Sequence, residues 1–495
     1  MVGVIFRSRD HAPSPRGRIR PGYHWRVLSV ITVGSMLTGM NASTLNVALP
    51  VVARHFDAGP SAAHWVLLSF MLTNTVLLVL FGRISDVVGR RTMNLGGYAL
   101  FTLSSLLLGL APSIEVLIAL RVVQAIGFAM ILANSTALIA HAFPADRLSQ
   151  GMGVYISAIS LAQVLGPSVG GLIAASAGWR WVFWFNVPIG LLAVCWGAVT
   201  LRKVPRGPRE PIDVRGTLLL LGWLGGLLFA VSESSALGWD AAVVRAGLLA
   251  CAVLLPVFWW TQRRTAHPLI DVSLYRDAAF SLANLAAFLH TLARFGVVLI
   301  FSLFFQGLWR VDAGTAGLAV LPVPIAMLAS SPLAGLLARL AGARTVAVFG
   351  PACTAAGLLV LLPALDAGTP YWMFAVGLAL MGAGSGIFLT CNTTAIMSRV
   401  PDDRLGAVNG QRLTLQNVGN TLGIAMSLTL ITGPLPASQR PQVYAGLVPG
   451  TGDALLTGYR HAVIVMTAMA LLSLAAAVAG MLAERAAGSR EPAGP

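Results

Sequence analysis

Long apolar stretches alternate with short polar connections along the whole chain. Fourteen of these stretches are long enough to cross a hydrocarbon core, which takes about 20 residues. They cover residues 25–49, 65–82, 94–110, 115–142, 149–177, 181–201, 214–232, 242–261, 279–308, 315–339, 345–364, 371–399, 405–432 and 460–483. The pattern therefore predicts an all-α polytopic membrane protein with 14 transmembrane helices.

Small and polar residues recur at a nearly constant spacing, which indicates a duplicated unit. The stretch from Gly82 to Arg91 joins two apolar runs and has a weaker copy, 253 residues later, at Gly335 to Arg344. In the copy, Arg339 stands in the place of Asp86. The other matched pairs are Gly82 with Gly335, Gly89 with Gly342, Arg91 with Arg344, Gln163 with Gln416, Gly170 with Gly423 and, at a spacing of 258, Asn134 with Asn392.

The repeat predicts the domain organisation. One copy covers residues 25–201 and the other residues 279–483, so the segment 202–278, with two further spans, belongs to neither. These two spans have almost no polar residue in their middles, and we expect them to face lipid. Residues 1–24 and 484–495 are polar tails.

Composition agrees with a membrane protein and changes the interpretation of the charge. The chain is 56% hydrophobic and only 10% charged, outside the range of soluble domains. A net charge of +15 alone would suit a nucleic-acid partner, but 24 of the 33 Lys and Arg residues fall on the side that holds both termini. The positive-inside rule then predicts cytoplasmic termini, with the lipid bilayer as the partner and no nucleic acid. The excess of Arg over Lys, 32 to 1, indicates a high-GC bacterium and hence a bacterial plasma membrane.

Several ionisable residues lie inside the predicted spans. Arg121 lies roughly 9 Å along the fourth span, at a depth similar to that of Asn41, and should face the protein interior with a partner. In the ninth span His290 and Arg294 are one helical turn apart, and Gln306 lies further out. For each of these residues a purely structural role, paired within the bundle, is the alternative to a role in binding or coupling.

The thirteenth span has a polar stripe. Arg412, Gln416 and Asn420 follow one another at intervals of four residues and so share one helix face. Such stripes line water or a substrate more often than lipid. Three arginines without a central acid suggest an anionic substrate. The amides Asn41, Asn134, Gln163, Asn392 and Gln416 are candidates for substrate binding, with interhelical hydrogen bonding as the alternative.

The fifth span has a face of small residues. Gly166 and Gly170 recur at a spacing of four, Gly171 follows, and Pro167 removes one backbone hydrogen bond. Another helix can therefore lie closely against this face, and the proline permits bending.

These motifs together resemble the major facilitator superfamily and, within it, the drug:proton antiporters with fourteen spans. Gly82 to Arg91 looks like the motif between helices 2 and 3, and Arg121 to Gln124 looks like the helix 4 motif, with Ala125 where glycine is usual. Gly166 to Gly171 is similar to the exporter motif of helix 5, and Trp179 to Gly190 resembles the signature that precedes helix 6.

The resemblance implies two six-helix bundles plus two additional central spans, with substrate bound near the midplane between rocking bundles. It implies that Gly82, Arg83, Asp86, Gly89, Arg90 and Arg91 gate the cytoplasmic side, where Asp86 pairs with an arginine or a helix N-terminus. It further implies that Gly166, Pro167, Gly170 and Gly171 hinge helix 5 against its counterpart in the other half. Arg121 and Gln124 would serve proton coupling. We expect a monomeric multidrug or antibiotic exporter.

One position departs from the family pattern. Asn41 stands where these antiporters commonly have an aspartate, and an amide does not titrate. No Asp or Glu lies in the middle of any predicted span, which leaves His290 as the mid-membrane group with an ordinary pKa near neutrality. Coupling therefore passes through His290, passes through an acid at a helix end, or is absent. Proton antiport is the expectation, and an uncoupled or differently coupled exporter of an acidic metabolite is the alternative.

Catalytic and metal-binding patterns are missing from the sequence. The four cysteines, Cys195, Cys251, Cys353 and Cys391, all lie in apolar spans and have no metal-ligand spacing. There is no buried carboxylate pair or nucleophile elbow. We therefore expect no enzyme activity and no cofactor other than protons as a coupling ion.

Overall fold

The computed structural model describes residues 22–202, 213–266, 268–270, 272–366, 368–435 and 452–488. These residues form helices and connections, with no strand among them. The first group of helices packs together as one bundle, in which α1 contacts α5 and α7, and α4 contacts α2 and α3. This first bundle consists of α1 (Tyr23–His55), α2 (Pro60–Val88), α3 (Arg90–Leu108), α4 (Ile114–Ala142), α5 (Leu148–Ser176), α6 (Trp181–Trp184) and α7 (Asn186–Thr200).

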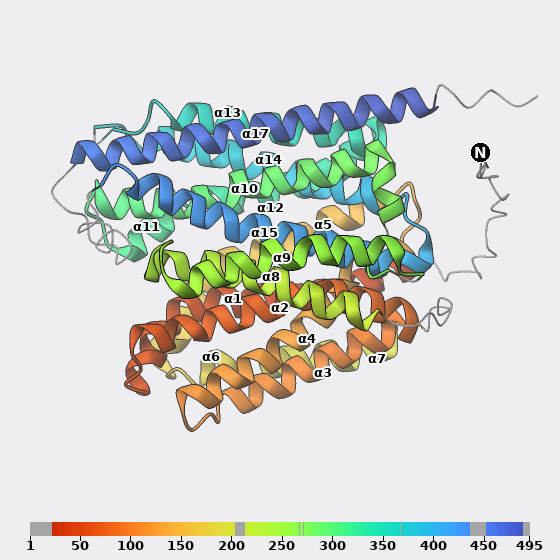
Figure 1. Cartoon of the computed structure of the whole chain (residues 1–495), viewed down its shortest axis with the longest axis horizontal. Helices are drawn as coiled ribbons and strands as arrows, with labels where there is room; N and C mark the ends of the chain where they lie inside the picture. Colours follow the sequence, from red (N-terminus) through yellow and green to blue (C-terminus); the bar gives the residue numbers. More distant parts are fainter. Residues whose placement is uncertain are drawn as a thin grey trace, which may run out of the picture.

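A second bundle forms in the same way from the second half of the chain, where α14 packs on α12 and α13, and α10 packs on α15 and α17. It consists of α10 (Ala278–Gly307), α11 (Ala313–Ala319), α12 (Pro322–Ala341), α13 (Ala343–Leu361), α14 (Tyr371–Met397), α15 (Leu405–Thr432) and α17 (Gly452–Gly488). A short 3-10 turn, η2 (Asp402–Arg404), precedes α15. In Figure 1 the first bundle is red to yellow and the second is green to blue.

A helix lies over each of the fourteen predicted stretches, but the count of fourteen spans is not confirmed. In the described residues, 11 helices are long and apolar enough to cross a membrane, or 12 if the bent α1 is one span. The two parts of α1, Tyr23–Leu45 and Ala48–His55, meet at 61°. The helices α3 and α15 are not among those that qualify. Both have a polar composition, because α3 begins with two arginines and α15 has the stripe that includes Arg412.

The two extra helices, α8 (Val214–Leu237) and α9 (Ala242–Arg264), lie across the junction of the bundles (Figure 1). The 3-10 helix η1 (Val272–Arg276) then leads into α10. Leu220, Leu224 and Leu228 of α8 join a buried cluster with Val79 of α2 and Val418 of α15. Only 11% of the apolar window of α9 is buried, so α9 presents most of its surface outward, as expected of a lipid-facing helix. The pair is therefore attached to both bundles through α8.

The bundles approach each other most closely on one side, the side on which α1 begins, called here the amino-terminal side. Leu78 of α2 lies against Gly410 of α15, and Gly153 of α5 lies against Ser331 of α12. In the described residues, the hydrogen bonds between α2 and α15 reach from Gly406 only as far as Asn417, about midway along α15. The structure is therefore closed on the amino-terminal side.

Candidate functional site

The stretch from Gly82 to Arg91 is more helical than its role as a connection suggested. α2 continues to Val88 and α3 begins at Arg90, so Gly89 alone separates them. Gly89 has a φ of 107°, where a side chain would strain the backbone. Its counterpart in the repeat, Gly342, has a φ of 84° between α12 and α13. The duplicated glycine thus makes the same tight turn in both bundles.

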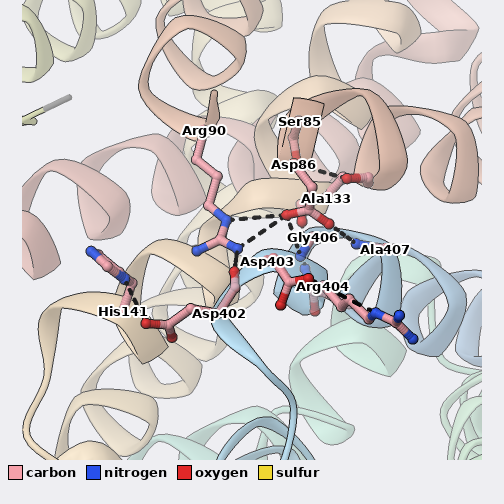
Figure 2. Close-up of polar contacts among 12 residues, drawn as sticks. Ser85, Asp86, Arg90, Ala133, His141, Asp402, Asp403, Arg404, Gly406 and Ala407 are labelled. Carbon is pink, nitrogen blue, oxygen red and sulfur yellow. Dashed lines mark hydrogen bonds and ion pairs between the residues drawn. The ribbon is translucent and has the colours of Figure 1, made fainter. Parts of the chain in front are cut away.

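Asp86 caps the first turn of α15 from the opposite bundle, as Figure 2 shows. Its carboxylate accepts hydrogen bonds from the backbone N–H groups of Gly406 at 3.1 Å and Ala407 at 2.9 Å. It also accepts from Arg90 Nη2 at 3.0 Å. A carboxylate is favourable there, because the first N–H groups of a helix have no partner within it and carry partial positive charge. Asp86 therefore has both predicted kinds of partner, an arginine and a helix N-terminus.

Around this carboxylate, further contacts join the bundles. Arg90, which is 4% exposed, also donates to the backbone carbonyl of Asp402, and His141 of α4 lies 3.6 Å from the Asp402 carboxylate (Figure 2). Arg83 is partly buried on α2. A polar junction between the bundles is thus made at the amino-terminal side by four residues: Asp86, Arg90, His141 and Asp402.

The glycines Gly82 and Gly335 occupy equivalent places at the two edges where the bundles meet. A Cβ atom on Gly82 would lie 3.0 Å from the carbonyl carbon of Gly406 in α15, and one on Gly335 would lie 3.0 Å from that of Ser149 in α5. Neither backbone could yield without separating the helices. The repeat thus supplies two pseudo-equivalent close approaches, α2 with α15 and α12 with α5.

The arginines of the repeat also have equivalent partners. Arg91 Nη2 donates to the carbonyl of Ala198 in α7 at 2.7 Å, and Arg344 Nη1 donates to that of Gly480 in α17 at 3.2 Å. Arg91 therefore ties α3 to α7, the last helix of the first bundle, and Arg344 ties α13 to α17, the last helix of the second. Arg339, which replaces Asp86 in the copy, is 44% exposed and lies 3.9 Å from Asp146.

A second set of contacts between the bundles was not predicted from the sequence. The side-chain amide of Asn409 in α15 donates to the carbonyls of Leu132 at 3.2 Å and Ala133 at 2.8 Å in α4. Thr414 donates to the backbone carbonyl of Thr75 in α2 at 3.2 Å, and Asn417 donates to the hydroxyl of Thr75 at 3.2 Å. The sequence signal that could have indicated these contacts is the polar face of α15 next to the stripe of Arg412, Gln416 and Asn420.

Asn41, Arg121 and Gln124 form one buried network inside the first bundle. Arg121 Nη1 donates to Gln124 Oε1, and Gln124 Nε2 donates to Asn41 Oδ1 at 3.4 Å and to Ser105 Oγ at 2.8 Å. Arg121, 1% exposed, also donates to the carbonyl of Val66 at 3.2 Å. The expectation that Arg121 faces the interior with a partner agrees with this geometry, and its described partners are uncharged.

His290 and Arg294 have different surroundings although they are one turn apart. His290 is fully buried, with Nε2 3.3 Å from Ser385 Oγ and its ring 4.5 Å from that of Phe388. Arg294 is partly exposed, and its Nη1 lies 3.6 Å from the sulfur of Met327. Its guanidinium also lies over the ring of Phe295. The two residues therefore have separate hydrogen-bond partners in this structure.

The stripe on α15 is partly connected. Arg412 Nη1 donates to Thr393 Oγ1 at 3.1 Å and to Gln416 Oε1 at 3.4 Å, and its Nη2 donates to Asn409 Oδ1 at 2.9 Å. Arg412 is only 5% exposed. Asn420 lies one turn beyond Gln416, and its Oδ1 has no partner in the described residues.

The other amides are bound within their own bundles. Asn134 donates to the carbonyl of Met130 in its own helix, Asn392 donates to that of Ala283, and Gln306 donates to Ser302. Gln163 is partly exposed on α5. The three hydrogen-bonded amides have separate partners, so these contacts do not bring them together.

The small-residue face of α5 contacts a different helix from the one expected. A Cβ atom on Gly166 would meet the side chain of Ser43, and one on Gly170 would lie 2.7 Å from Cα of Thr44. Both neighbours belong to α1, in the same bundle. The counterpart of α5 in the repeat is α15, where Gly423 matches Gly170, and α12 of the other bundle meets α5 near Ser149 and Gly153. Pro167 lies inside α5 beside this face, and Gly171 is partly exposed. The motif therefore packs within the bundle, because the edge with α12 uses residues nearer the start of α5.

These features define a class of protein: a multi-pass membrane transporter built from two related bundles. The sequence profile of the Major Facilitator Superfamily matches residues 31–266 and 283–494. The chain belongs to the major facilitator superfamily.

The chain is similar in sequence to bacterial resistance proteins and in fold to a solved transporter structure. The chain is 32% identical to the multidrug resistance protein Stp of Mycobacterium tuberculosis over 412 residues, which are 83% of this chain and 76% of that protein. It is 29% identical to the methylenomycin A resistance protein of Streptomyces coelicolor, over 86% of this chain and 89% of that protein. The structure of the human organic anion transporter MFSD10 superposes with a TM-score of 0.62 at 18% identity, over 90% of this chain and 99% of that chain. At this low identity, the similarity to the MFSD10 structure shows a shared fold and nothing further.

Proposed function

We propose that this protein exports a small organic compound with an acidic group, by alternating access across a bacterial plasma membrane. We infer the acidic group of the substrate from three arginines. In the described residues, Arg121, Arg294 and Arg412 lie in the spans with only uncharged partners. A charge within the membrane is costly without a counter-ion. An anionic cargo supplies one, whereas a lipophilic cation meets an unfavourable field.

The direction of transport is proposed from the relatives. The names of the similar bacterial proteins describe resistance to drugs and antibiotics, and resistance by a transporter requires export. The distribution of Lys and Arg supports cytoplasmic termini, so the amino-terminal side is the cytoplasmic side in this proposal. The closed side then faces the cytoplasm, and the structure corresponds to an outward-facing arrangement.

Two modes of energy coupling follow from the polar residues. In the first, which the family resemblance favours, protons are exchanged for substrate and His290 carries them, because it is a titratable group within a span. In the second, transport is uncoupled from protons. The network of Arg121 and Gln124 ends in the amide of Asn41, which does not titrate, and this observation favours the second mode.

Uncoupled export of an anion has a driving force of its own. A membrane potential of 100 mV, negative inside, is worth about 2.3 kcal/mol for each elementary charge moved outward. At about 1.4 kcal/mol for each factor of ten, this corresponds to a concentration ratio of roughly 50. An organic anion can therefore be expelled without a proton-carrying acid.

The test is transport by the purified protein in proteoliposomes. Carboxyfluorescein serves as the anionic probe and rhodamine 123 as the cationic probe, under an imposed pH gradient or an imposed potential. Proton antiport predicts accumulation driven by the pH gradient and lost in His290→Gln. Uncoupled export predicts accumulation that follows the potential alone, and a gain of pH dependence in Asn41→Asp. Transport of rhodamine 123 with no transport of carboxyfluorescein would refute the acidic substrate.

A further inference from the structure

Asn409 connects the mid-membrane arginine Arg412 to the closed side of the molecule. Both residues lie on α15, and both are buried, with Asn409 at 0% and Arg412 at 5% exposure. Asn409 is three residues beyond Gly406, whose N–H binds Asp86, and so belongs to the part of α15 that contacts the first bundle. In the described residues, it is also the side chain through which α15 donates hydrogen bonds to α4.

The two ends of the Asn409 amide are used differently. Its nitrogen donates across the bundle junction to the carbonyls of Leu132 and Ala133, and its oxygen accepts from Arg412 Nη2 at 2.9 Å. An amide nitrogen only donates and an amide oxygen only accepts, so the orientation is fixed from both sides. The carbonyls of α4 therefore hold Asn409 with its oxygen directed at Arg412 for as long as the amino-terminal side is closed.

Arg412 has donor capacity beyond these contacts. Its Nη1 donates to Thr393 and Gln416, and its Nε is buried with no partner in the described residues. A guanidinium has five N–H donors in a planar fork that suits a carboxylate, a sulfonate or a phosphate group. A substrate anion that binds across Nε and Nη2 shares Nη2 with the oxygen of Asn409 and so competes with it.

We propose that Asn409 is a positioning residue that lowers the affinity of Arg412 for an anionic substrate when the amino-terminal side closes. This inference rests on the proposed function, since it requires an anionic cargo. When α15 stands away from α4, the amide of Asn409 loses its two carbonyl partners and is free to rotate. The anion then binds Arg412 without competition from Asn409. When the bundles close, Asn409 is locked onto Arg412 and the anion is released more readily.

The arrangement suits an exporter, which must bind its cargo on the cytoplasmic side and release it outside. Linkage requires the effect to be reciprocal: a bound anion that draws Arg412 from Asn409 must weaken closure by the same factor. Hydrogen bonds to charged groups typically change equilibria by about tenfold or more. We therefore expect a difference of that order between the affinities of the two states.

The experiment compares Asn409→Ala with Thr414→Val. Thr414 also joins α15 to the first bundle, through the carbonyl of Thr75, but has no bond to Arg412 in the described residues, so its variant loosens the junction without removing the competitor. Binding of carboxyfluorescein is titrated in both variants, in the wild type and in Arg412→Gln. The distance between spin labels at Arg147, the exposed residue just before α5, and at Leu340, exposed on α12, reports closure of the amino-terminal side.

The expected result is that Asn409→Ala binds carboxyfluorescein about tenfold more tightly than Thr414→Val at the same degree of closure, and exports it more slowly. Equal affinities in the two variants, or affinities that differ only as closure does, would overturn the role of Asn409 while leaving an anion exporter intact. If the wild type does not bind carboxyfluorescein, or if Arg412→Gln binds it unchanged, the anionic substrate site at Arg412 fails and the inference fails with it.

Discussion

Replacing Asp86 by asparagine tests what holds the amino-terminal side closed. The carboxylate is 6% exposed and accepts from Gly406, from Ala407 and from Arg90. Arg90 lies one turn from Asp86 and would stay beside it after the bundles separate. Of the bonds that Asp86 makes, only the two to α15 are therefore lost on opening, and only these two contribute to its part in the preference for the closed arrangement.

The magnitude follows from those two bonds. Each is a hydrogen bond to a charged acceptor, worth about 1.5–3 kcal/mol when removal leaves partners unsatisfied. Asparagine has one acceptor oxygen, and its NH2 group would face N–H donors. We expect Asp86→Asn to shift the equilibrium toward opening by about 2–4 kcal/mol, since water replaces part of what is lost. At about 1.4 kcal/mol per factor of ten, the ratio of open to closed molecules rises roughly 30- to 1,000-fold.

The repeat provides a matched control at the equivalent position. Arg339 is 44% exposed and lies 3.9 Å from Asp146, so its ion pair is screened by solvent and contributes at most about 1 kcal/mol. Arg339→Gln should therefore change the ratio no more than about fivefold. The assay is the distribution of distances between spin labels at Arg147 and Leu340, in protein whose 4 native cysteines are replaced. A distribution unchanged by Asp86→Asn, or an equal shift in both variants, would refute the reasoning.

Three further predictions concern local structure. Gly89→Ala should lower the thermal unfolding temperature of the purified protein, because a residue with a Cβ pays about 1–3 kcal/mol for a backbone with a φ of 107°. Asp213→Ala should destabilise the α8–α9 pair by about 1–2 kcal/mol, since Asp213 caps α8 at Gly216 and accepts from Gln262 at 2.6 Å; faster hydrogen exchange at the start of α8 would reveal it, and unchanged exchange would contradict it. The hydrogen bond from Thr315 holds the pKa of Asp312 below its usual 3.8, so this cap contributes stability above pH 3.8 that is lost as the pH falls through the lower folded value. The protection factor of the Thr315 amide, which removes the intrinsic pH dependence of exchange, should fall only below that pH, and a fall near neutrality would contradict the assignment.

The positions of the helices and the equivalence of the two halves were predictable from the sequence. The hydrophobic stretches correspond to helices, because a span must satisfy its backbone hydrogen bonds internally. The spacing of 253 residues correctly paired Gly82 with Gly335, which occupy equivalent close approaches. The depth of Arg121 correctly placed it at the level of Asn41, to which Gln124 connects it.

The choice of partners across the molecule was not predictable. The pattern around Gly166 identifies a face that another helix can approach, but not which helix, and the structure places α1 there rather than a helix of the other bundle. Asn409 lies 276 residues from Ala133, and no periodicity within one helix relates the two. Contacts of this kind depend on how whole bundles pack, and one polar residue on a helix face looks like another until the neighbouring helix is known.

The two edges of the closed side show what duplication followed by divergence has produced. Gly82 and Gly335 bring the backbones of both edges equally close, so the shape of the junction is nearly symmetric. Its polar contacts are not. At the α2–α15 edge a buried carboxylate binds a helix N-terminus, and Asn417 and Thr414 add bonds to Thr75. At the α5–α12 edge the hydrogen bond in the described residues joins Ser157 to the carbonyl of Leu328.

This asymmetry has a mechanical consequence. Packing of small residues permits two helices to slide or part gradually, whereas buried charge-assisted hydrogen bonds must break together, because each unsatisfied group is costly. We therefore expect the junction of α15 with α2 and α4, which holds Asp86 and Asn409, to set the free energy of opening, and the α5–α12 edge to follow it. The exchange in the repeat of aspartate at 86 for arginine at 339 is one of the differences that distinguish the two edges.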